Sequence, residues 1–170
     1  MCNMSKTEIL QQLKSGCADH WRSTIDQGDG VGKLHWYSKI KQSFHFERYL
    51  DEIHNVKDRH SFTQLRISAH KLEVETGRYS KTPRQNRICK TCNSGICDEI
   101  HFLTKCAFAD AERQALFAIL YVECKNFTNL NDSEKSQYML VTAGSKIQLE
   151  VAKFCFNNFE KRKENLSQKI

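Results

Sequence analysis

Four cysteines and one histidine within one short stretch constrain this fold more than any other feature. The stretch ICKTCNSGICDEIHFLTKC contains the spacing C-x2-C-x8-H-x4-C. Two cysteines separated by two residues can bind one metal ion from a tight turn, and a following His and Cys can complete a tetrahedral site from a short helix. Thiolate and imidazole ligands without a carboxylate favour zinc. The sequence therefore predicts Zn²⁺ bound by Cys89, Cys92, His101 and Cys106.

A fifth candidate ligand, Cys97, lies inside the same loop and competes with Cys92 or His101 for a coordination position. The alternative without metal is a set of buried thiols in a reduced protein, with His101 as an ordinary core residue. Four protein ligands close the coordination sphere, whereas hydrolytic zinc needs an open position and a nearby base. The predicted zinc is therefore structural.

The size of the chain predicts one small domain with extensions at its ends. It has 170 residues, of which 39% are hydrophobic, so a metal ion would help to stabilise a modest core. One proline and seven glycines argue against a loop-rich β fold. We expect a mainly α fold, a small helical domain with a short-stranded or loop zinc knuckle. The expected organisation is an N-terminal helical arm (1–30), a zinc-stapled domain (31–160, knuckle 88–108) and a charged tail (161–170).

The expected location is inside the cell, in the nucleus or cytoplasm. No apolar run is long enough to cross a bilayer, and the N-terminus lacks the apolar stretch of a signal peptide. Eight cysteines without such a signal indicate a reducing compartment, where metal binding is commoner than disulfide formation.

Apolar spacing and capping residues predict a series of helices. The first covers 5–27, with Ser5 and Glu8 as a capping box, and ends at a glycine-rich break, 27–32. Its apolar stripe is expected to face inward and consists of Ile9, Leu13, Cys17, Trp21 and Ile25. Later helices are expected at 46–53, 55–69, 98–106, 109–125, 131–144 and from Ser145 onward. Cys17, Cys124 and Cys155 have no partner at metal spacing and are interpreted as small core residues.

Positive charge is concentrated beside the metal motif. Residues 57–90 contain nine Lys or Arg against three Asp or Glu, which accounts for the whole net charge of +6. An extended basic segment at 70–87, stopped by Gly77 and Pro83, can lie along a phosphate backbone. The alternative is a solvated surface. The candidate nucleic-acid-binding residues are Arg66, Arg78, Lys81, Arg84, Arg87 and Lys90, with Trp36 or Tyr79 as stacking groups.

Three segments in a fixed order resemble a known family. LRISAHKLEVETGRY, TPRQNRICKTCNSG and DEIHFLTKC are similar to the C-terminal region of LINE-type (non-LTR) retrotransposon polyproteins, where a CCHC zinc motif follows the reverse transcriptase domain. The likeness covers about 33–125. It implies a retroelement fragment or domesticated remnant that helps to hold RNA or DNA near a polymerase. The resemblance carries the four zinc ligands to the residues named above and basic positions to Arg66, Arg78, Arg84 and Arg87, whereas Cys97 departs from the family pattern.

The chain lacks the motifs of the enzymes associated with such elements. It has no YxDD-type polymerase motif, no paired-carboxylate nuclease signature and no Gly-rich phosphate loop followed by Lys-Ser/Thr. The sequence thus predicts a non-enzymatic zinc-binding module that binds RNA or single-stranded DNA. A separate reverse transcriptase or another protein is a possible partner, whereas a membrane or a small-molecule substrate is not expected. Two alternatives stay open: a zinc-stapled protein–protein interaction module, and a transposon remnant without selected activity.

Overall fold

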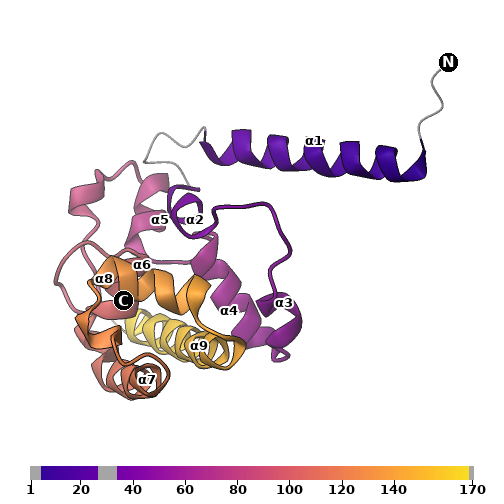
Figure 1. Cartoon of the computed structure of the whole chain (residues 1–170). Coiled ribbons are helices and arrows are strands. Elements are labelled where there is room, and N and C mark those ends of the chain that lie inside the picture. The colour runs from indigo at the N-terminus through magenta and orange to yellow at the C-terminus, as the bar shows by residue number, and fades with distance from the viewer. Residues whose placement is uncertain (1–4, 27–33, 169–170) are drawn as a thin grey trace.

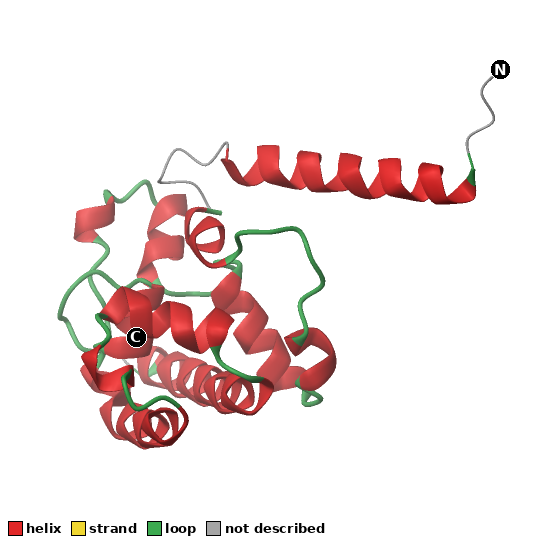
Figure 2. Cartoon of the chain, viewed as in Figure 1, coloured by secondary structure: helices red, strands yellow, loops and turns green. Residues whose placement is uncertain are grey.

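The fold comes from a computed structural model, in which residues 5–26 and 34–168 are described. Its regular structure is helical (Figure 2), and the one extended pairing found within these ranges is an isolated antiparallel bridge between Ile88 and Ile96. The mainly α fold predicted from the sequence is confirmed. None of the helices in the described ranges has the length and apolar character needed to cross a membrane.

The α-helices differ widely in length. They are α1 (Lys6–Asp26), α2 (His35–Ile40), α3 (Tyr49–Glu52), α4 (Val56–Arg66), α5 (Glu73–Tyr79), α6 (Glu99–Thr104), α7 (Asp110–Glu123), α8 (Asp132–Gln137) and α9 (Ser145–Ser167). Single turns connect some of them: the 3-10 turns η1 (Arg84–Asn86), η2 (Ala107–Ala109) and η3 (Phe127–Asn129), and the π-helical turn η4 (Tyr138–Thr142).

The last helix, α9, is the centre of the domain. It packs most extensively against α4 and also contacts α3 and α7 (Figure 1). The inward stripe predicted for this helix is confirmed, because Ile147, Val151, Phe154 and Cys155 are all buried. The expected tail at 161–170 instead continues α9 as far as Ser167, and Arg162 within it is only 5% exposed.

Local capping explains where several helices begin. Asn131 and Glu134 form the predicted capping box before α8. The Ser5 hydroxyl accepts a hydrogen bond from the Glu8 amide at 3.3 Å, and the Glu8 carboxylate accepts one from the Ser5 amide at 2.7 Å. Such reciprocal pairs satisfy backbone donors that the first turn of a helix leaves without partners.

The N-terminal helix α1 extends away from the rest of the domain (Figure 1). Its last turn meets the domain, since Ile25 is buried and the Trp21 ring lies 5.9 Å from that of Phe44. A helix of this length is about 30 Å long, so contact at one end leaves the other in solvent. The predicted inward stripe is therefore wrong for Ile9, Leu13 and Cys17, which are exposed. The glycine-rich break expected at 27–32 lies outside the described residues.

The segment before the metal motif is compact and not extended as the sequence suggested. Gly77 lies inside α5, where an added Cβ would come within 2.7 Å of the Arg87 side chain. The glycine thus makes room for Arg87, which donates hydrogen bonds to the carbonyls of Val74 at 2.6 Å and Thr82 at 2.8 Å. Arg87 therefore stabilises this segment from within.

Candidate metal centre

Backbone turns place the four candidate ligands close together. Cys89 and Cys92 lie in the turn between the bridged residues Ile88 and Ile96, and His101 and Cys106 come from α6 and the residue just before η2. The turn is closed by a hydrogen bond from the Cys89 amide to the Gly95 carbonyl at 3.1 Å.

Two local features fix the orientation of this turn and of α6. Gly95 has φ +67°, a conformation that favours glycine, and it lies against the His101 ring. Asp98 caps α6 as predicted, accepting a hydrogen bond from the His101 amide at 2.9 Å. The cap residue lies three positions before His101, so the imidazole projects from the first turn of α6.

The ligand atoms of Cys89, Cys92, His101 and Cys106 all lie within 4.8 Å of one another. The two sulfurs of Cys89 and Cys106 are 3.8 Å apart, and the Cys92 sulfur is 3.3 Å from Nε2 of His101. Three of the four residues are buried and Cys92 is half-buried. This cluster can hold a metal ion, as the spacing predicted.

A buried arginine from α9 completes the surroundings of the cluster. Arg162 donates to the Cys89 sulfur at 3.4 Å and to the Thr91 hydroxyl at 2.7 Å, and it is ion-paired with Glu73. Sequence reasoning missed this residue because it is 73 positions from Cys89 and lies in a segment expected to be a tail. The feature of the sequence that could have indicated it is its spacing. Arg162 lies four residues after Asn158, on the buried face of α9.

Cys97 belongs to a second, smaller group, with Glu73 and Cys89, and not to the four-ligand cluster. It is 1% exposed. Hydrogen bonding to Cys89, together with burial, raises the pKa of the Cys97 thiol. The pKa of Cys89 is lowered by hydrogen bonds from the Cys106 and Cys97 thiols. Cys89 is also the sulfur that Arg162 contacts.

Two of the predicted nucleic-acid-binding residues are buried. Arg66 is 2% exposed and donates to both carboxylate oxygens of Glu47 at 3.0 Å and to the Leu140 carbonyl. Arg87 is 9% exposed and is held by the two carbonyls described above. The prediction that Arg66 and Arg87 contact phosphate is corrected, because their guanidinium groups bind other parts of the protein.

The other four predicted residues lie nearer the surface. Arg78 pairs with Glu75 at 3.2 Å and Arg84 with Asp98 at 3.0 Å, whereas Lys81 and Lys90 are exposed. Of the two proposed stacking groups, Trp36 is buried and Tyr79 is 84% exposed. The structure thus does not gather the six basic residues into one surface.

Comparison with known proteins found no matching family model, no matching curated protein and no matching solved structure. The resemblance to the LINE-type retrotransposon region therefore stays a prediction from the sequence.

Proposed function

We propose that this chain is a non-catalytic module, stapled by zinc, that binds single-stranded nucleic acid and derives from a retrotransposon protein. The observation that carries the metal assignment is the convergence of Cys89, Cys92, His101 and Cys106. Two sulfurs bound to one tetrahedral zinc at about 2.3 Å lie about 3.8 Å apart. The Cys89–Cys106 separation of 3.8 Å matches that value and supports zinc.

The proposed role of the metal is structural. A zinc ion bound by four protein ligands supplies cross-linking and no open position for a reacting water. It would join the turn at Cys89 to α6, while Arg162 connects the same sulfur to α9. Hydrogen bonds to a thiolate ligand reduce its charge and fix its direction. Arg162 is thus a positioning residue for the proposed site.

The distribution of exposed charge supports nucleic acid as the partner. All five arginines of residues 57–90 bond to other protein groups, and the fifth, Arg59, donates to the carbonyls of Leu50 and Ile53. The exposed cations of this region are its four lysines, at positions 57, 71, 81 and 90, together with Arg84, which pairs with Asp98. Lysine ammonium groups bind phosphates as point charges. The net charge of +6 is thus presented outward mainly by lysine.

Elemental analysis tests the metal assignment. The protein, purified from a reducing host, should contain one zinc per chain, and so should Cys97→Ala. Cys106→Ala should lose the metal because it removes one of the four ligands. Absence of zinc from the parent protein, or its loss from Cys97→Ala alone, would contradict the assignment.

Binding of a labelled single-stranded oligonucleotide tests the proposal that the partner is nucleic acid. Affinity should fall as salt rises, with a logarithmic slope of about −0.7 for each phosphate contacted. A zinc-loaded, folded protein that shows no such binding refutes nucleic acid as the partner while leaving the metal assignment in place.

A second candidate function, protein docking, is favoured by the exposed apolar face of α1. Ile9 and Leu13 are 46% and 60% exposed, although their spacing is that of a helix face that packs. Sedimentation of the full chain and of a variant without residues 1–26 tests this function. Self-association that depends on α1 would support it, and identical monomers would count against docking between copies.

A further inference from the structure

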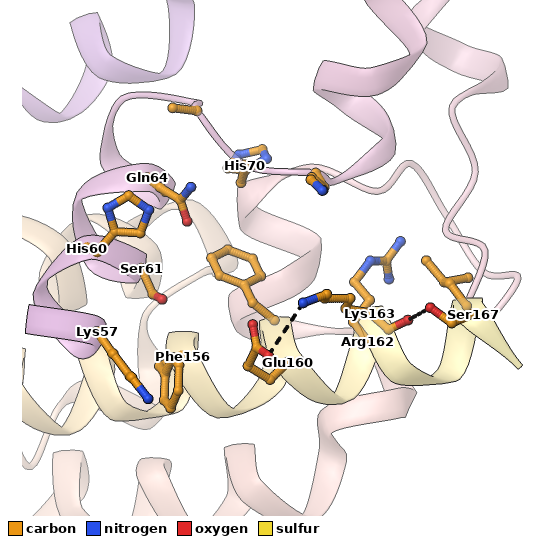
Figure 3. Close-up of a pocket in the computed structure, with 14 residues that line it drawn as sticks. Lys57, His60, Ser61, Gln64, His70, Phe156, Glu160, Arg162, Lys163 and Ser167 are labelled. Carbon is orange, nitrogen blue, oxygen red and sulfur yellow. Dashed lines mark hydrogen bonds and ion pairs between the residues drawn. The ribbon is translucent and has the colours of Figure 1, made fainter.

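A groove lies between α4 and the C-terminal half of α9 (Figure 3). Its volume is about 530 Å³, within the range of ligand-binding clefts. One wall carries Lys57, His60 and Gln64 of α4, and the facing wall carries Phe156 and Lys163 of α9. The groove was not indicated by the sequence, because its two walls are about a hundred residues apart.

Lysine side chains surround this groove. Among the described residues, Lys57 and Lys71 have no carboxylate partner, and Lys163 lies 3.9 Å from Glu160 in an exposed pair. Lys57 is in the first turn of α4, where the helix dipole disfavours a cation. Its position is therefore not explained by helix stability. The groove therefore presents positive charge, which favours an anionic ligand.

An aromatic ring lies beside this charge. Phe159 packs into the core and stacks on Phe102 at 4.7 Å, whereas Phe156 lines the groove outside the core cluster. The Lys57 ammonium lies 5.9 Å from the centre of the Phe156 ring. An aromatic face next to a lysine is the arrangement that stacks an unpaired base and binds its phosphate.

The α4 wall also offers polar groups. His60, Ser61 and Gln64 point toward the groove in Figure 3, and in the described ranges their side chains make no hydrogen bond within the protein. An imidazole, a hydroxyl and an amide can each pair with a base edge or with a ribose 2′-hydroxyl, which donates and accepts.

We propose that the groove between α4 and α9 binds single-stranded RNA, with phosphates at Lys57 and Lys71, a base against Phe156, and sugar hydroxyls toward the α4 wall. This inference rests on the proposed function and moves the contact surface from the arginine-rich segment to the groove. A single strand is required because a duplex keeps its bases stacked within the helix. The unpaired lysines select an anionic strand over a neutral ligand.

The test compares two double variants that remove the same charge. Lys57→Gln with Lys71→Gln alters the groove, and Lys81→Gln with Lys90→Gln alters the segment beside the metal centre. Anisotropy of a labelled oligouridine should show about tenfold weaker binding for the groove variant, with the salt slope less negative by about 1.4 for two lost phosphate contacts. The segment variant should weaken binding less than the groove variant does, because Lys81 and Lys90 do not line the groove.

A third variant separates stacking from charge. Phe156→Leu keeps an apolar side chain but removes the ring, so it should weaken oligouridine binding several-fold and leave inorganic polyphosphate binding unchanged. Circular dichroism confirms that each variant is folded before its affinity is compared.

The remaining outcomes contradict specific steps. If only the segment variant loses binding, the proposed function stands, but the groove is not the binding surface. Equal affinity for the matching DNA strand overturns the assignment of RNA, and equal affinity for duplex RNA overturns single-strand binding. Groove variants that lose binding to polyglutamate but not to oligouridine assign the groove to an acidic protein. No binding by the parent protein refutes the proposed function itself.

Discussion

Arg162 connects the last helix of the domain to the candidate metal centre. Its guanidinium contacts the Cys89 sulfur, the Thr91 hydroxyl and the Glu73 carboxylate, all inside the protein. Burial of a charge is tolerated only when the charge is paired and hydrogen-bonded. These contacts make the side chain a required partner for Glu73 as well as for Cys89.

Replacing Arg162 should therefore be strongly destabilising. Arg162→Gln leaves the Glu73 carboxylate buried without a cation, which lowers the free energy of unfolding by about 3–5 kcal/mol. The matched control is Lys153→Gln, since Lys153 forms an exposed pair with Glu150 on the same helix, and such pairs contribute about 0–1 kcal/mol. Urea denaturation measures both, and similar midpoints for the two variants would contradict the assigned role of Arg162.

Gly77 provides a second test at a single position. In Gly77→Ala the new methyl group would meet Arg87 side-chain atoms at 2.7–2.9 Å, and two hydrogen bonds hold that side chain in place. We expect destabilisation of about 1–3 kcal/mol, as for other overpacked sites. Gly16→Ala in α1 is the control, because a Cβ added at residue 16 would have no atom within 4 Å. This substitution should instead stabilise the helix by about 1 kcal/mol. If thermal melts show no loss of stability in Gly77→Ala, the close approach between residue 77 and the Arg87 side chain is contradicted.

The Glu47 carboxylate makes stability depend on pH. Burial raises its pKa, but Lys41 and Arg66 outweigh burial, so the pKa lies below its ordinary value of 4.5. A carboxyl with a depressed folded-state pKa stabilises the fold above its ordinary pKa, and this contribution is lost as pH falls through the folded-state value. Unfolding measured from neutral to acid pH should lose less stability below pH 4.5 in Glu47→Gln than in the parent protein. Parallel pH profiles for the two proteins would exclude this contribution.

At the scale of elements, the features that were predictable from the sequence are those set by near neighbours. The caps at Asp98 and Asn131 involve residues three positions away, and the four candidate ligands span only 18 positions. The helix α5 was missed because the reason for Gly77 is its contact with Arg87, which depends on tertiary structure. The roles of Arg66 and Arg162 were missed for the same reason, since their partners lie far along the chain.

The limited contact of α1 predicts what happens when it is removed. Only its C-terminal end contributes to the buried surface, mainly through Ile25, and full burial of one such side chain contributes about 1.5–3 kcal/mol. Deleting residues 1–26 should thus reduce stability by no more than that amount and leave a cooperative transition. Chemical denaturation followed by circular dichroism measures the change. A shortened protein without a cooperative transition would show that α1 is part of the folding unit.

At the scale of the whole molecule, the candidate metal centre is joined to the main helical packing and is not an appendage. The Cys89 turn contacts α9 through Arg162, and α9 packs along α4. Loss of order at the cluster therefore removes the partners of a residue buried in the central helix. The fold should respond to the metal as one unit.

Removal of the proposed zinc should unfold the domain as a whole. Structural zinc contributes on the order of 10 kcal/mol to small domains, whereas the total stability of a domain is about 5–15 kcal/mol. After chelation, hydrogen exchange should therefore lose protection in α4 and α9 as well as in α6. Cys97→Ala, which keeps all four ligands, should show the same protection before chelation and the same loss after it. Loss confined to residues 88–106 would mean that the helices fold without the metal, and the contact through Arg162 would then not couple the cluster to the fold.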